Sequence, residues 1–88
     1  MGERFFLYND IVDSKTRFVS FMGDQSRFDL AVITTDRFYG KKLVLDMQST
    51  RFAIIGQDDL EEEGYIEHAF QIAEDEASEL RDFLYEVV

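Results

Sequence analysis

Leu30-Ala31-Val32-Ile33-Thr34 is the stretch that decides the fold of this 88-residue chain. It is apolar at odd and even positions alike, which is typical of a strand covered on both faces in the middle of a sheet. We therefore expect residues 27–35 to form the central strand. Gly23-Asp24-Gln25-Ser26 before it, and residues 36–40 after it, supply the turn chemistry for connections to neighbouring strands.

Strand patterns lie on both sides of this centre. Residues 16–22 alternate polar and apolar, residues 41–48 alternate in the same way, and residues 51–56 follow a plausible tight turn at Ser49-Thr50. The aromatic and aliphatic residues 4–8 predict one more strand at the amino terminus. We therefore expect an antiparallel meander of at least five strands.

Two segments after the meander are less clear. Residues 58–63 carry five carboxylates, which predicts an exposed loop or one helical turn begun by Asp58 or Asp59 as a cap. Residues 65–72 alternate like a strand, but Ile66 and Phe70 also fit a helical stripe. We favour a sixth strand, because the alternation is complete and the next helix has its own start signal.

That start signal is Glu74-Asp75-Glu76, three acids where a helix favours negative charge. Behind it, apolar residues recur at spacings of three and four, at Ala77, Leu80, Leu84 and Val87. The sequence thus predicts a single α+β domain over residues 1–88. It is an antiparallel meander of five or six strands, with curling toward a small barrel as a variant, and a carboxy-terminal amphipathic helix.

Charge and composition narrow the function classes. The net charge is −10, and it lies in residues 57–88, where twelve acids face the single base Arg81. Such a chain is repelled by phosphate backbones and anionic membranes, so nucleic-acid and membrane partners are disfavoured. We interpret the acidic third as a solvated surface; docking of a basic partner and mimicry of nucleic acid are the alternatives.

The absence of cysteine excludes disulfides and thiolate chemistry and suits a reducing compartment. No signal-peptide or myristoylation pattern opens the chain. The aromatic content of 15% is too high for a disordered tail, and charges interrupt every apolar run that could span a membrane. We expect a cytoplasmic protein without a membrane anchor.

No catalytic constellation is visible. His68 is the only imidazole, no nucleophile elbow surrounds a serine, and no glycine-rich phosphate loop occurs. We expect His68 to be a structural residue on a strand face, and we expect neither an enzyme nor a cofactor. The acidic loop 58–63 does not match the EF-hand pattern, although a loose divalent-cation site there stays open.

One turn is both basic and aromatic, and we take it as the candidate partner-binding site. It comprises Arg37, Phe38, Tyr39, Lys41 and Lys42, around Gly40. Its cations and rings suit an anion or an acidic segment. The alternative is an ordinary solvated turn whose nearest acidic partner is the protein's own tail, within one chain or across a subunit contact.

The sheet has more apolar surface than one helix covers, since residues 74–87 span only about 20 Å. We expect one set under the helix, namely Phe18, Leu30, Val32, Leu43, Leu45, Phe52 and Ile54. That arrangement leaves a second set on the reverse side, namely Val19, Phe21, Ala31, Ile33, Val44 and Ile55. Either the sheet curls into a barrel or a second copy covers it, so we expect a homo-oligomer, with a dimer favoured.

Residues 17–23, 27–41 and 80–85 carry a resemblance, through RFVSFMG, RFDLAVITTDRFYGK and LRDFLY. Over most of its length the chain resembles short uncharacterised cytosolic proteins of Bacillus and Staphylococcus relatives, classed as a domain of unknown function. The resemblance implies a cytoplasmic bacterial setting and no residue roles.

As function we expect a small non-enzymatic, homo-oligomeric module that binds another protein. The alternatives are an RNA- or nucleotide-binding module using the basic turn, and a carboxylate-based, metal-dependent hydrolase.

Overall fold

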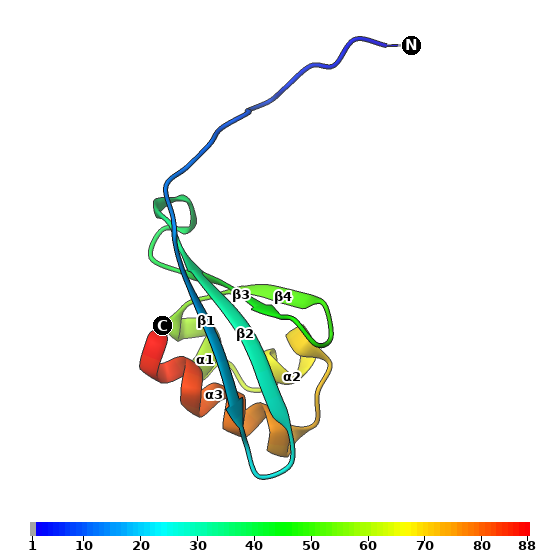
Figure 1. The fold of residues 1–88 in the computed structure, drawn as a ribbon, viewed down its shortest axis with the longest axis vertical. Coiled ribbons are helices and arrows are strands. Elements are labelled where there is room, and N and C mark those ends of the chain that lie inside the picture. Colours follow the sequence, from blue (N-terminus) through cyan, green and yellow to red (C-terminus); the bar gives the residue numbers. More distant parts are fainter. Residues whose placement is uncertain (1) are drawn as a thin grey trace.

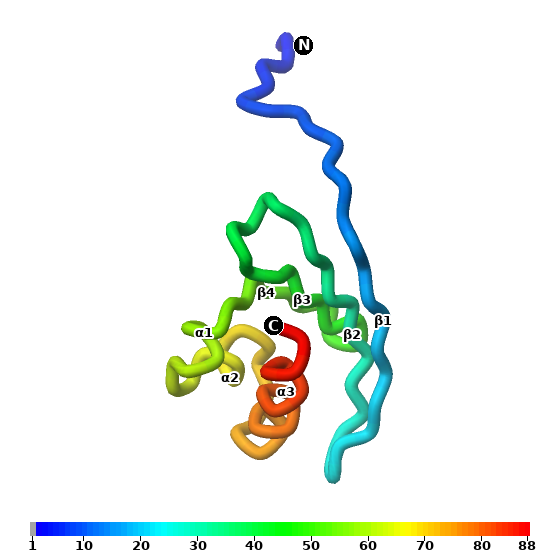
Figure 2. Tube along the Cα trace, turned by 90° about the vertical axis from the view of Figure 1, so that its left-hand side faces the viewer, coloured from blue at the N-terminus to red at the C-terminus, as the bar shows by residue number. Residues whose placement is uncertain are grey.

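The computed structural model describes residues 2–88 and shows an α+β protein of two layers (Figure 1). One layer is an antiparallel sheet with the order β1-β2-β3-β4. Its strands are β1 (Lys15–Met22), β2 (Arg27–Thr34), β3 (Lys42–Asp46) and β4 (Arg51–Ile55). The other layer holds α1 (Gln57–Glu61), α2 (Tyr65–Phe70) and α3 (Glu74–Val87). Figure 2 shows these helices on one side of the sheet.

The predicted meander and the carboxy-terminal helix are confirmed, but the number of strands is wrong. Residues 2–88 contain four strands rather than five or six. Residues 4–8 form no strand and extend away from the sheet. The sheet is open, with β1 and β4 at its edges, so the small-barrel variant is also wrong.

The predicted sixth strand, residues 65–72, is instead the short helix α2. Gly64 and Gln71, which flank it, both adopt positive φ, at 80° and 55°. Left-handed backbone angles interrupt an extended strand, so Gly64 before the helix and Gln71 after it mark the two ends of α2. Ile66 and Phe70, one turn apart, are fully buried, whereas His68 between them is exposed, so the helical stripe and not the alternation describes this segment.

The acidic segment forms the single helical turn that was one of its two predicted forms. Helix α1 is capped by Gly56, however, and not by Asp58 or Asp59. The Asp59 carboxylate reaches back and accepts a hydrogen bond from the Gly56 N–H at 2.8 Å. A carboxylate in the first turn thus satisfies a backbone donor that the helix leaves unpaired.

The core lies between the sheet and the helices. Its strand residues are Phe28, Leu30, Val32, Val44 and Ile55, and its helix residues are Leu60, Ile66, Phe70, Ala77, Leu80 and Leu84. The stripe predicted for α3 is confirmed, because Ala77, Leu80 and Leu84 are fully buried. Phe21 joins this side of the core. Its ring stacks on that of Phe28, with 5.1 Å between the ring centres, and its ring centre lies 5.0 Å from that of Phe83.

The predicted assignment of residues to the two faces of the sheet is therefore wrong for most of them. Leu30 pairs with Val19, and Val32 pairs with Val44, so these residues share the helix-covered face. Phe18 pairs with Ala31 and Leu45 pairs with Phe52, which places these residues on the opposite face. A difference of one residue in a strand moves a side chain to the other side, and both sides of this sheet are apolar enough for either assignment.

Candidate functional site

The basic turn predicted as a partner-binding site connects β2 to β3. Its first part is a 3₁₀ turn, Asp36–Phe38, and Tyr39 follows in a left-handed conformation with a side chain that is 96% exposed. Phe38 is half-buried. Lys42 belongs to β3, opposite Thr34 and Ile55, and is half-buried. The structure thus places Tyr39 in solvent and Lys42 within the sheet.

Arg37 contacts the amino-terminal segment. Its Nη1 lies 3.3 Å from an Asp10 carboxylate oxygen, and its guanidinium lies 4.4 Å from the centre of the Tyr8 ring. Both contacts favour the cation, and the pKa of Arg37 is raised by its interactions with Tyr8 first and Asp10 second. Sequence patterns gave no sign of this contact, because the partners are 27 residues apart.

Lys41 binds the acidic segment. Its Nζ lies 3.0 Å from Asp59 Oδ2 and 3.6 Å from Asp58 Oδ2. The chain's own acidic tail is thus the partner of this lysine, within one chain. The Asp59 hydrogen bond also raises the pKa of Lys41. Partial burial raises the pKa of the Asp59 carboxyl, but the Gly56 N–H and Lys41 together outweigh burial and hold that pKa below its ordinary value.

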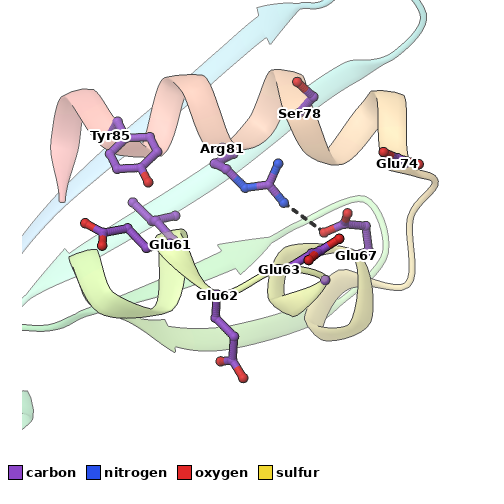
Figure 3. A pocket seen from close by; sticks show the side chains of 10 residues that line it. Glu61, Glu62, Glu63, Glu67, Glu74, Ser78, Arg81 and Tyr85 are labelled. Atoms are coloured by element: carbon purple, nitrogen blue, oxygen red, sulfur yellow. Dashed lines mark hydrogen bonds and ion pairs between the residues drawn. The ribbon is translucent and has the colours of Figure 1, made fainter.

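An acidic cleft of about 620 Å³ lies between α3 and the α1–α2 turn (Figure 3). Its charged lining is Glu61, Glu62, Glu63, Glu67, Glu74 and Arg81. Arg81 points from α3 across the cleft and donates to Glu67 Oε1 at 2.8 Å. This ion pair joins α3 to α2, and it uses the one cation on the wall of the cleft.

The remaining polar residues singled out in the sequence are not gathered into a reactive site. His68 lies on α2 and is exposed, so its predicted place on a strand face is wrong. Across residues 2–88, the structure brings no three His, Asp or Glu side chains into an arrangement that could hold a metal ion. The structure has no helix, within the described residues, that is long and apolar enough to cross a membrane.

The face of the sheet opposite the helices is an exposed apolar surface, which we call the open face. Its most exposed members are Phe18 (72%), Met22 (73%), Phe52 (66%) and Ile54 (40%). Between them lie Ala31, Ile33, Leu43 and Leu45, which are half-buried or buried by their neighbours. The charged strand residues on this face are Arg27 and Asp29, and they form an ion pair at 3.2 Å.

A second exposed apolar surface lies in residues 4–14, which we call the arm. Phe5, Leu7 and Ile11 are each at least 89% exposed, and Phe6, Tyr8 and Val12 are also exposed. The arm leaves the amino-terminal end of β1 at an angle, extends beyond the body of the protein and accounts for much of the 50 Å long axis (Figure 1). The sequence pattern found these apolar residues but assigned them to the sheet of the same chain.

Comparison with known proteins identifies the family of the chain. No curated protein matches the chain. The sequence profile of the SAV0927-like family matches residues 7–86, which include every strand and helix described above except the last residue of α3. The chain therefore belongs to the SAV0927-like family.

Proposed function

We propose that the protein is a small, non-enzymatic, homo-oligomeric interaction module whose open face packs against the open face of a second copy. The observation that carries this proposal is an apolar row across all four strands of the open face, Phe18, Ala31, Leu45 and Phe52, with Ile54 and Met22 also exposed on the same face. Contiguous apolar patches on soluble proteins commonly mark interaction sites. Since each exposed apolar square ångström forgoes about 25 cal/mol, covering this face stabilises the assembly.

The distribution of charge favours a second copy in this orientation. The helical layer, residues 57–88, carries twelve acids and one base, whereas the charged strand residues on the open face neutralise each other. Packing open face on open face keeps the two acidic layers on the outside, far apart. Packing helix against helix would bring like charges together.

The size of the open face sets the strength of this contact. Four strands about 4.8 Å apart, with a mean length of six to seven residues, give a face of roughly 20 Å by 20 Å. That is about 400 Å² per copy in projection, or about half of the roughly 800 Å² that each partner buries in a standard stable interface. We therefore expect weak, concentration-dependent association through this face alone.

Sedimentation velocity over a range of protein concentrations tests the proposal. Phe52→Lys places a charge on the open face, and we expect it to raise the dissociation constant at least about tenfold. Tyr85→Lys makes the same kind of change on α3 and serves as the control, with no effect expected. A wild-type protein that stays monomeric at high concentration, or a Phe52→Lys protein that associates as the wild type does, would contradict the proposal.

The two alternative functions have less support. RNA or nucleotide binding needs free cations beside exposed rings, but Arg37 and Lys41 already contact acids of the same chain. A carboxylate-based hydrolase needs converging ligands, and residues 2–88 bring no such group together. A steep salt dependence of RNA binding would revive the first alternative, and a rise in melting temperature with Mg²⁺ or Mn²⁺ the second.

A further inference from the structure

The arm has the composition of a strand but no strand partner. Phe5, Leu7 and Ile11 alternate with Phe6, Tyr8 and Val12, so an extended arm has apolar side chains on both sides. In a single chain these side chains are exposed, and the arm takes part in no strand ladder. Such a segment gains stability from any surface that pairs its backbone and covers its side chains.

A free strand edge of the right length is present on β1. This strand has eight residues and pairs with β2 along one side only. About every second residue of an edge strand points its N–H and C=O groups outward, where another strand can bind them. Proline and glycine are absent from β1, so neither of these common protections interrupts its edge. The other edge strand, β4, has only five residues.

The arm begins where β1 begins and extends away from the sheet at an angle to β1, so it does not cover the edge of its own strand (Figure 1). If the arm swings into line with β1, a second copy rotated by a two-fold axis perpendicular to the sheet near Ser14 brings its arm alongside β1 in antiparallel orientation. The same rotation places the first arm on the second β1, as an isologous contact requires. Residues 6–13 then lie opposite residues 15–22 of the other copy, and all eight residues of the edge are used.

Charge is complementary across this contact. The arm contains Asp10 and Asp13 and is preceded by Glu3, with Arg4 as its only base. Strand β1 contains Lys15 and Arg17 and no acid. In the two-fold arrangement Asp13 lies directly opposite Lys15, where an opposite-charge pair stabilises neighbouring strands.

We propose that the arm of each copy adds as a strand to the free edge of β1 in a second copy, so that two molecules share one continuous sheet. Arg37 supports this exchange, because its contacts with Tyr8 and Asp10 order this part of the arm and keep it clear of its own β1 edge before it meets its partner. A segment that is ordered in advance loses less entropy on binding. The edge contact is separate from the open face, so it stands or falls independently of the face-to-face contact proposed above.

Paired arm variants test the exchange in the full-length protein. Leu7→Pro combined with Val12→Pro removes two backbone donors. Because positions 7 and 12 differ by an odd number, at least one of the two points into the new ladder. We expect the dissociation constant of the dimer to rise about 100-fold or more, measured by sedimentation velocity. Leu7→Ile combined with Val12→Ile keeps a strand-forming arm and is expected to dimerise as the wild type does.

Amide hydrogen exchange gives a second measurement. We expect amides of residues 6–13 to become protected as protein concentration rises, and to stay unprotected in the proline variant, whose circular dichroism should show an intact fold. Unchanged dimerisation of the proline variant overturns the arm exchange. Protection that is independent of concentration also overturns it, since the arm would then fold back on its own chain.

Comparison with Phe52→Lys separates the two proposals. Association that is lost in the proline variant but kept in Phe52→Lys supports the arm exchange and contradicts the open-face contact. The opposite pattern supports the open-face contact alone. A wild-type protein that is monomeric at every concentration overturns both.

Discussion

Replacement of Leu30 and of Phe18 by alanine, one at a time, tests which face of the sheet the helices cover. The two residues lie in neighbouring strands, and both are large and apolar. Leu30 is fully buried under the helices, whereas Phe18 is 72% exposed on the open face. We therefore expect the two side chains to contribute very differently to the free energy of unfolding.

The expected loss of unfolding free energy in each variant follows from how deeply the side chain is buried. Removal of a buried leucine side chain costs about 2–5 kcal/mol, because apolar contact is lost and a cavity remains. A phenylalanine buries about 150–250 Å² when fully covered, so a ring that is about one quarter covered contributes at most roughly 1–2 kcal/mol. For a domain of this size, a loss of about 3 kcal/mol lowers the melting temperature by roughly 12–24 °C.

Urea unfolding followed by far-ultraviolet circular dichroism measures both values. The protein should be kept at low concentration, because association would stabilise the wild type and conceal the effect of Phe18→Ala. We expect Leu30→Ala to lower the free energy of unfolding by at least twice as much as Phe18→Ala. If Phe18→Ala is as destabilising as Leu30→Ala in monomeric protein, the assignment of the two faces is wrong.

Two further predictions concern the turns. The pKa of Asp59 is lowered in the folded protein. The contribution of Asp59 to stability is therefore present above its ordinary pKa of 3.8 and is lost as the pH falls through the folded value. We expect Asp59→Asn to weaken the fall in melting temperature below about pH 4. An equally steep fall in the variant would show that Asp59 has no such role. Thr50 holds φ at 60°, where a β-branched residue is strained, so Thr50→Gly should stabilise the protein by about 1 kcal/mol in thermal unfolding. A lower melting temperature for Thr50→Gly would contradict this account of the β3–β4 turn.

The candidate site could be located only in part from the sequence. The basic turn was identified by its residue types, but its contacts join residues far apart in the chain, Arg37 with Asp10 and Lys41 with Asp59. These pairs depend on how the turn, the arm and α1 meet in space. No local pattern encodes such a meeting, so the sequence offered the protein's own acidic tail as an alternative partner of the turn but did not indicate the contact of Arg37 with the arm.

The segment 65–72 shows why local patterns disagreed with the fold. Its alternation of apolar and polar residues is a real strand signal, yet Ile66 and Phe70 also lie one helical turn apart. A strand would place His68 on the same face as Ile66 and Phe70, whereas the helical form buries Ile66 and Phe70 below β4 and leaves His68 exposed. Tertiary packing therefore selected the helix, although the local pattern favoured the strand.

The sequence by itself determined the order of the strands, the antiparallel meander over residues 15–55, the terminal helix and the concentration of acid in the last third. These features depend on short-range periodicity and on turns, which neighbouring residues specify. Only the tertiary structure decided which face of the sheet is buried. Both faces are apolar, and the choice was made by where α1, α2 and α3 fit together, with Leu30, Val32 and Val44 beneath them and Phe18 and Phe52 in solvent.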